Sequence, residues 1–264
     1  MNYLEAILLA IVEGLTEFLP VSSTGHMIIA GAMLGIEPTV FSKTYTVAIQ
    51  LGAILAVVAV YWERFFQTLR FYVMLAIGVV PALLFGFIFG DWIDQALERV
   101  DVVGYGLLIG GVVLLFVDGW FKADGNPESE INPKNSFIIG TFQCLAILLP
   151  GISRSGSTIV GGLTRGLGRK QAAEFSFLLA VPTMVAATGY KLLDFFKDGN
   201  RFAENELPLL LTGNLVAFIV AWLAIKGFIQ LLEKKGFFLF GVYRIVAGGI
   251  ILALYYAGLD MAIL

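Results

Sequence analysis

The sequence predicts an all-α polytopic membrane protein, built as an inverted repeat with six transmembrane helices and two broken re-entrant hairpins that meet near the midplane. Of the 264 residues, 58% are hydrophobic and only 14% are charged, whereas a soluble domain carries about 25% charged residues. Apolar stretches recur along almost the whole chain and are separated by short charged clusters. Two pairs of these stretches are interrupted by a proline and several hydroxyl side chains. This pattern is typical of a membrane bundle with broken helices.

Six of the apolar segments are expected to cross the membrane, because a helix needs about 20 apolar residues to span roughly 30 Å of hydrocarbon. Four others are shorter or interrupted and form two pairs, broken at residues 20–25 and 150–156. We expect each pair to form a re-entrant hairpin, and the alternative is ten simple transmembrane helices. The segments cover residues 3–19, 24–36, 44–62, 71–90, 102–119, 137–149, 155–167, 172–190, 207–226 and 237–257.

The two breaks resemble each other, which suggests an internal repeat. Pro20 matches Pro150, and Ser22 matches Ser153 when one residue is inserted. We therefore expect one membrane domain over residues 1–264, with repeat one at about 1–120, a polar linker at about 121–136 and repeat two at about 137–258. Each repeat would cross the membrane three times, and an odd number of crossings inverts the second repeat relative to the first.

The distribution of basic residues predicts the orientation of the chain. On this topology, ten Lys and Arg side chains fall on one side and five on the other, and the last two of the 17, Arg154 and Arg244, lie at membrane depth. The richer side should be cytoplasmic, so both termini and the acidic loop 91–101 would lie outside. We expect Arg244 near a membrane surface. The net charge of −3 argues against a nucleic-acid partner.

Glu13 and Glu17 lie within an apolar run and share one helix face, because they are four residues apart. Placing a carboxylate at the bilayer centre costs about 2.5–3.5 kcal/mol. Such a pair is expected to bind a divalent cation or to keep one proton between its members. The alternative is a helix at the interface with both carboxylates hydrated.

The breaks also supply groups suited to an anion. Hydroxyl side chains cap the free N–H groups of a helix, and uncapped N–H groups at two facing helix N-termini would enclose a phosphate-sized pocket. Gly25 and Gly156 would let a phosphate oxygen approach the backbone. The candidate phosphate-binding residues are Ser22, Thr24, Gly25, Ser153, Ser155, Gly156, Ser157 and Gln50; Gln50 could instead only hydrogen-bond a neighbouring helix.

His26 and Arg154 are the remaining candidates for chemistry. His26 is the only histidine in the chain; it could attack phosphorus, act as a general acid or base, or be a satisfied core or interface residue. Arg154 presents a planar fork suited to phosphate oxygens, although a salt bridge to Glu13 or Glu17, or extension to the surface, would also accommodate it. Together with Ser23 and a Mg²⁺ or Ca²⁺ ion at Glu13 and Glu17, these groups could catalyse phosphoryl transfer.

Two motifs resemble the signatures of the bacterial undecaprenyl-diphosphatases, also called bacitracin-resistance proteins. The first runs from Glu13 to His26 and the second from Pro150 to Gly156. The resemblance extends over nearly the whole chain, and residues 174–182 are also similar to that family.

The resemblance implies an enzyme of the bacterial plasma membrane that removes the terminal phosphate of undecaprenyl diphosphate, giving undecaprenyl phosphate and inorganic phosphate. This reaction recycles the lipid carrier of cell-wall synthesis. The resemblance also implies a divalent-metal requirement and a site open to the outer side of the membrane. It makes Glu17, Ser23, His26 and Arg154 the catalytic residues, with Glu13 as a metal-binding or orienting carboxylate. We favour Ser23 as the nucleophile, activated by His26 and Glu17, over direct attack by His26. A homodimer is left open.

The principal alternative is a transporter or flippase for a phosphorylated lipid carrier. Inverted repeats with broken helices that meet at the midplane are also transporter architecture, and the same cluster could then bind phosphate without cleaving it. Pure transport needs no nucleophile, so the combination of Ser23, His26 and Arg154 favours chemistry.

Overall fold

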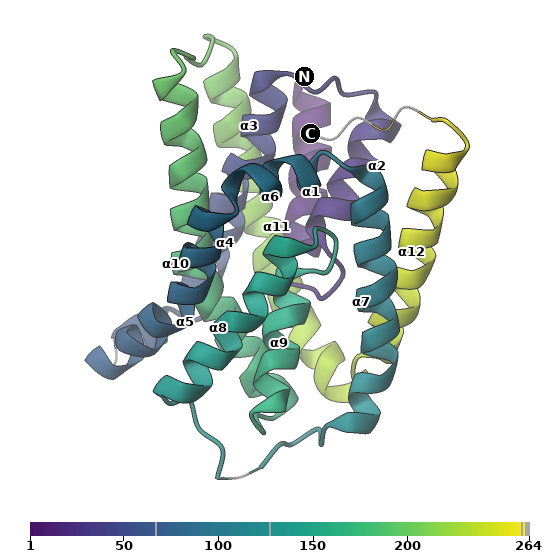
Figure 1. Cartoon of the computed structure of the whole chain (residues 1–264). Helices are drawn as coiled ribbons and strands as arrows, with labels where there is room; N and C mark the ends of the chain where they lie inside the picture. The colour runs from purple at the N-terminus through teal and green to yellow at the C-terminus, as the bar shows by residue number, and fades with distance from the viewer. Residues whose placement is uncertain (67, 127, 260, 262–264) are drawn as a thin grey trace.

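A computed structural model describes residues 1–66, 68–126, 128–259 and 261 of the chain. The described part is a bundle of α-helices with one short 3₁₀-helix and no strand (Figure 1). The elements are α1 Tyr3–Thr16, α2 Ser23–Leu34, α3 Val40–Ala48, α4 Gln50–Val60, η1 Trp62–Phe66, α5 Leu69–Ile88, α6 Gly90–Leu97, α7 Val100–Trp120, α8 Pro133–Leu148, α9 Arg154–Thr164, α10 Arg169–Lys197, α11 Glu206–Lys235 and α12 Phe238–Tyr256.

Within the part of the chain that the structure describes, six helical stretches are long and apolar enough to cross a membrane. They are α3 with α4, α5, α7, α10, α11 and α12. The predicted all-α membrane architecture is therefore confirmed, and the chain is a multi-pass membrane protein. The re-entrant path of the other two helix pairs, α1 with α2 and α8 with α9, stays a prediction.

Both predicted breaks are real interruptions of the backbone. A serine stands at the N-cap of the second helix in each pair, with φ of 69° at Ser22 and 77° at Ser153. These are the only residues other than glycine with positive φ in the described part of the chain. A non-glycine residue in this conformation is strained, and such strain gathers at functional sites.

Several helices of each half of the chain pack against helices of the other half. Helix α1 packs against α11 and α8 packs against α5, while α4 contacts α11 and α10 contacts α5. Helices α7 and α12 pair with each other. Two related halves would produce such a pattern, so the contacts favour the predicted repeat, which stays a prediction.

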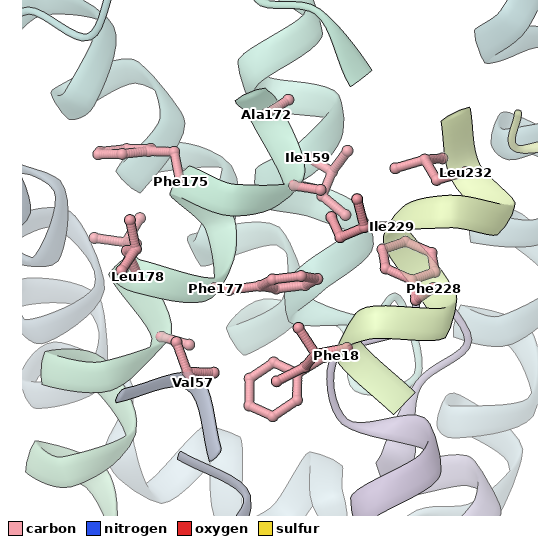
Figure 2. Close-up of a cluster of buried hydrophobic side chains, with 14 of the residues drawn as sticks. Phe18, Val57, Ile159, Ala172, Phe175, Phe177, Leu178, Phe228, Ile229 and Leu232 are labelled. Atoms are coloured by element: carbon pink, nitrogen blue, oxygen red, sulfur yellow. The ribbon is translucent and has the colours of Figure 1, made fainter. Parts of the chain in front are cut away.

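An aromatic cluster anchors the first break in the core. Phe18, between α1 and Ser22, is fully buried, and its ring meets Phe177 of α10 edge to face with centroids 5.4 Å apart. Figure 2 shows Phe177 beside Phe228 of α11. The centroids of these two rings are 5.9 Å apart. The neighbouring Glu17 is thereby held against the second half of the chain.

The prediction of an acidic loop over residues 91–101 is wrong for most of this segment. Residues 90–97 form the short amphipathic helix α6. Periodicity over eight residues is too short to distinguish such a helix from a polar loop.

The helices approach closely where glycines remove side chains. A Cβ on Gly140 of α8 would lie 2.0 Å from the carbonyl oxygen of Gly78 of α5. By contrast, a Cβ on Gly86 of α5 would meet nothing within 4 Å.

We predict that Gly140→Ala destabilises the protein by about 1–3 kcal/mol, because the added methyl group forces two helix backbones apart. Thermal unfolding in detergent measures the effect. Gly86→Ala is the matched control and should unfold at the wild-type temperature or slightly higher, since alanine favours helix. An unchanged midpoint for Gly140→Ala would contradict the close packing of α5 and α8.

Candidate active site

A cavity of about 270 Å³ lies where the two breaks meet. It is lined by both breaks together with residues of α4, α6, α8 and α10, and Ile93 and Leu97 bring α6 to its edge. Seven of the predicted site residues line it: Glu17, Ser22, Ser23, Thr24, Gln50, Ser153 and Arg154. A larger cavity of about 460 Å³ lies near the linker and includes none of the predicted residues. The cavity at the breaks is therefore the candidate active site.

Glu17 connects the two breaks through its carboxylate. One oxygen, Oε2, accepts a hydrogen bond from the Ser23 hydroxyl at 2.5 Å. The other, Oε1, pairs with Nη2 of Arg154 at 2.9 Å. The side chains of Glu17 and Arg154 are mostly buried, with 7% and 15% of their surface exposed. A hydroxyl is thus placed against a base that a third group orients, which is the usual arrangement of an activated nucleophile.

Arg154 keeps donors for a second ligand. Its Nη1 reaches the carbonyl oxygen of Ser176 only at 3.4 Å, and its buried Nε has no hydrogen-bond partner among the described residues. The guanidinium also lies near the ring of Phe18, with Cζ 5.9 Å from the centroid. The salt bridge to Glu17 that the sequence left open is present, and the remaining donors can still bind an anion in the cavity.

Glu13 and Gln143 carry buried oxygen atoms that remain unpaired. Each residue exposes only 1% of its surface, and neither Glu13 Oε1 nor Gln143 Oε1 has a hydrogen-bond partner among the described residues. An unpaired buried polar atom is costly unless a ligand or water satisfies it. Within the described residues, no group of three His, Cys, Asp or Glu side chains could hold a metal ion by itself.

Both ring nitrogens of His26 contact groups other than Ser23 and Glu17. Its Nδ1 lies 2.7 Å from the carbonyl oxygen of Ser22, and its Nε2 lies 2.6 Å from the hydroxyl of Tyr243. The two rings stack at 5.5 Å between centroids. Because a carbonyl only accepts, Nδ1 must donate, which leaves Nε2 of the neutral ring to accept from Tyr243. His26 is not among the residues that line the cavity.

The hydroxyls of the second break mainly hold the break together. Ser153 Oγ accepts from the Gly156 amide at 3.2 Å, as a helix N-cap does, and lies 3.0 Å from Ser155 Oγ. Ser155 Oγ donates to the carbonyl oxygen of Leu19 at 2.7 Å and so links the second break to the first. The hydroxyl of Ser157 is buried without a partner among the described residues.

The two glycines that were expected to admit a phosphate oxygen face protein atoms. A Cβ on Gly25 would lie 2.6 Å from Cδ1 of Leu107, and one on Gly156 would lie 3.4 Å from both Pro20 and Arg244. Neither glycine lines the cavity. Close packing against Leu107 therefore accounts for Gly25, whereas a Cβ on Gly156 would make only ordinary contacts. The contact of either glycine with phosphate stays a prediction.

Tyr243 and Gln143 are site neighbours that the sequence reasoning did not select. Tyr243 lies on the last helix and has no motif around it, so only the folded chain brings it to His26. Gln143 was recognised only as the counterpart of Glu13 in the second repeat, and that correspondence was the signal that could have identified it.

Comparison with known proteins identifies the family. Residues 6–250 match the family described as Bacitracin resistance protein BacA. The chain belongs to this family.

Curated relatives match over almost the full chain. A protein of Flavobacterium psychrophilum is 53% identical over 97% of each chain. One from Porphyromonas gingivalis is 49% identical over 100% of each, and one from Bdellovibrio bacteriovorus is 49% identical over 99% of each. All three are named undecaprenyl-diphosphatase.

We predict that His26 is a neutral imidazole with its proton on Nδ1 and none on Nε2, because its two hydrogen-bond partners impose this tautomer. The ¹⁵N chemical shifts of histidine-labelled protein in micelles report this tautomer, and they come from His26 alone because the chain has one histidine. In Tyr243→Phe, the loss of the hydroxyl should move the Nε2 signal and leave Nδ1 nearly unchanged. A proton on Nε2 in the neutral wild-type ring would contradict the placement of His26.

Proposed function

We propose that this chain is an undecaprenyl-diphosphatase that removes the terminal phosphate of undecaprenyl diphosphate within the membrane. The observation that carries the proposal is the Glu17 carboxylate, which holds the Ser23 hydroxyl and the Arg154 guanidinium together at a cavity between two helix N-termini. The full-length relatives named undecaprenyl-diphosphatase support the same conclusion. Their names give no support to the alternative of a lipid flippase.

In this proposal Ser23 is the nucleophile. Its oxygen attacks the terminal phosphorus, its proton passes to Glu17, and the bond from that phosphorus to the bridging oxygen breaks. Undecaprenyl phosphate leaves with the electron pair on the former bridging oxygen. Water then hydrolyses the phosphoserine, releasing inorganic phosphate and restoring the Ser23 hydroxyl. The contact between Ser23 and Glu17 favours this route over attack by His26, whose nitrogens are engaged elsewhere.

Arg154 and the two helix N-termini stabilise the charge on the transferring group. Phosphoryl transfer spreads negative charge over three equatorial oxygens, and positioning with electrostatic stabilisation provides most of the catalysis. Arg154 supplies its unpaired Nε and its weakly engaged Nη1. The positive ends of α2 and α9 add their N–H groups.

Glu13 and Glu17 are proposed to hold a Mg²⁺ or Ca²⁺ ion together with the diphosphate. The unpaired Glu13 Oε1 fits this role, and Mg²⁺ is commonly bound by one or two carboxylates plus substrate phosphates. Such an ion would neutralise charge on the phosphate oxygens.

We also propose that the protein lies in the bacterial plasma membrane with the cavity open to the outer side. Helix α6 borders the cavity, and it belongs to the segment that the distribution of Lys and Arg places outside. The oligomeric state stays open.

Purified protein should release phosphate from farnesyl diphosphate in the presence of Mg²⁺ or Ca²⁺ and lose this activity in EDTA. Ser23→Ala and Arg154→Lys should each lower kcat by at least about 10²-fold, since one removes the nucleophile and the other a fork of donors. Arg165→Lys is the matched control for Arg154→Lys, because Arg165 ends the same helix and donates to Asn135 outside the cavity. Near-normal turnover of Arg154→Lys would refute its role as a phosphate clamp.

Labelling with a membrane-impermeant maleimide tests the orientation. The only native cysteine, Cys144, is buried, so the background should be low. We expect Gln95→Cys in α6 to react from outside intact cells, and Lys134→Cys at the start of α8 to react only after the membrane is opened. The reverse pattern would place the cavity on the cytoplasmic side.

A further inference from the structure

Arg244 lies in the interior of the protein, and its expected position near a membrane surface stays a prediction. Only 1% of its surface is exposed. An isolated arginine in the middle of an apolar helix gives no sign in the sequence of what it contacts, because its partners lie on distant segments.

The guanidinium of Arg244 binds main-chain carbonyl groups on three segments of the chain. Nη1 donates to Pro20 O at 3.0 Å in the first break, and Nη2 donates to Gly151 O at 2.9 Å in the second. Nη2 also reaches Gly106 O at 3.2 Å, and Nε reaches Leu107 O at 3.4 Å, both on α7. No described carboxylate pairs with Arg244 within 4.0 Å. Carbonyl dipoles alone therefore compensate this buried charge.

The two break carbonyls occupy equivalent places. Pro20 stands two residues before Ser22, and Gly151 stands two residues before Ser153. These serines are the positive-φ N-caps of α2 and α9. A planar fork that grips both carbonyls fixes the distance and angle between the two helix N-termini, which lysine could not do with a single point charge.

Helix α7 leaves a slot for the guanidinium. A Cβ on Gly110 would lie 2.0 Å from Nη2 of Arg244, and a Cβ on Gly106 would lie 2.1 Å from the carbonyl oxygen of Pro150. Arg244 is not among the residues that line the cavity, so its donors serve the backbone of the breaks and not a bound anion.

We infer that Arg244 is a positioning residue for the reaction: it sets the relative placement of the α2 and α9 N-termini, and with them Ser23 and Arg154, by holding the carbonyls of both breaks. This inference rests on the proposed function. Because it concerns an arrangement that stabilises the transferring phosphoryl group, loss of Arg244 should affect kcat more than KM.

The test compares Arg244→Lys and Gly110→Ala with wild type and with Gly119→Ala, a control on the same helix whose added Cβ meets nothing within 4 Å. Gly110→Ala keeps Arg244 and displaces its guanidinium, so it tests the inference even if Arg244→Lys fails to fold. Turnover of farnesyl diphosphate is measured per folded molecule, well below the unfolding temperature. The affinity for orthovanadate, measured from the rise in unfolding temperature that it causes, reports on the site in the absence of turnover.

We expect kcat to fall at least tenfold in both variants with KM changed less than threefold, and vanadate affinity to weaken in parallel with kcat/KM. Gly119→Ala should match wild type in all three measurements. Wild-type kcat and vanadate affinity in folded Arg244→Lys and Gly110→Ala would overturn the inference. Absence of phosphate release by wild type would instead refute the proposed function, and the vanadate measurement would still decide whether Arg244 positions the site.

Discussion

The ion pair between Glu17 and Arg154 is the contact on which the site depends, because it joins the two breaks and at the same time assembles the reactive groups. Both side chains are largely buried, where an unpaired charge is costly, and breaking a buried pair by removing one partner costs about 3–5 kcal/mol. The Glu17 carboxylate also accepts a hydrogen bond from the Ser23 hydroxyl. The orientation of the nucleophile is therefore tied to the association of the two halves of the chain.

Hydrogen bonds from side chains to backbone carbonyls also connect the two breaks. Ser155 donates to the Leu19 carbonyl, and Arg244 holds the Pro20 and Gly151 carbonyls. In a membrane interior these carbonyls have no water to bind, so interrupted helices persist only where protein groups satisfy the freed backbone. The positive φ angles of Ser22 and Ser153 persist because these contacts fix the backbone on either side of them. The strain and the buried charges lie at the site, while the aromatic cluster around Phe18 supplies ordinary packing beside it.

Much of this arrangement could be predicted from the sequence, because hydropathy and helix-breaking residues act locally. Six spanning segments and both breaks followed from apolar length, proline and clustered serines, and Glu17 and Arg154 stood out as charges within apolar runs. The orientation of His26 could not be predicted, since its partner Tyr243 comes from the other end of the chain. The carbonyl partners of Arg244 could not be predicted for the same reason, and α6 was too short to give a periodic signal. Local patterns thus identified the polar residues of the site, but only the packing of distant helices shows which of them meet.

The identity of the phosphorylated residue decides which side chain attacks phosphorus. Brief incubation with farnesyl diphosphate, rapid quenching and peptide mass spectrometry would locate a covalent phosphate on the wild-type chain, whereas Glu17→Gln, which lacks the proposed base, should form little of it. The account predicts an acid-stable, alkali-labile phosphate on Ser23 that is absent from Ser23→Ala. An acid-labile, alkali-stable phosphate on His26 would contradict it, and the contact between Glu17 and Ser23 would then have to serve a purpose other than activation of the nucleophile.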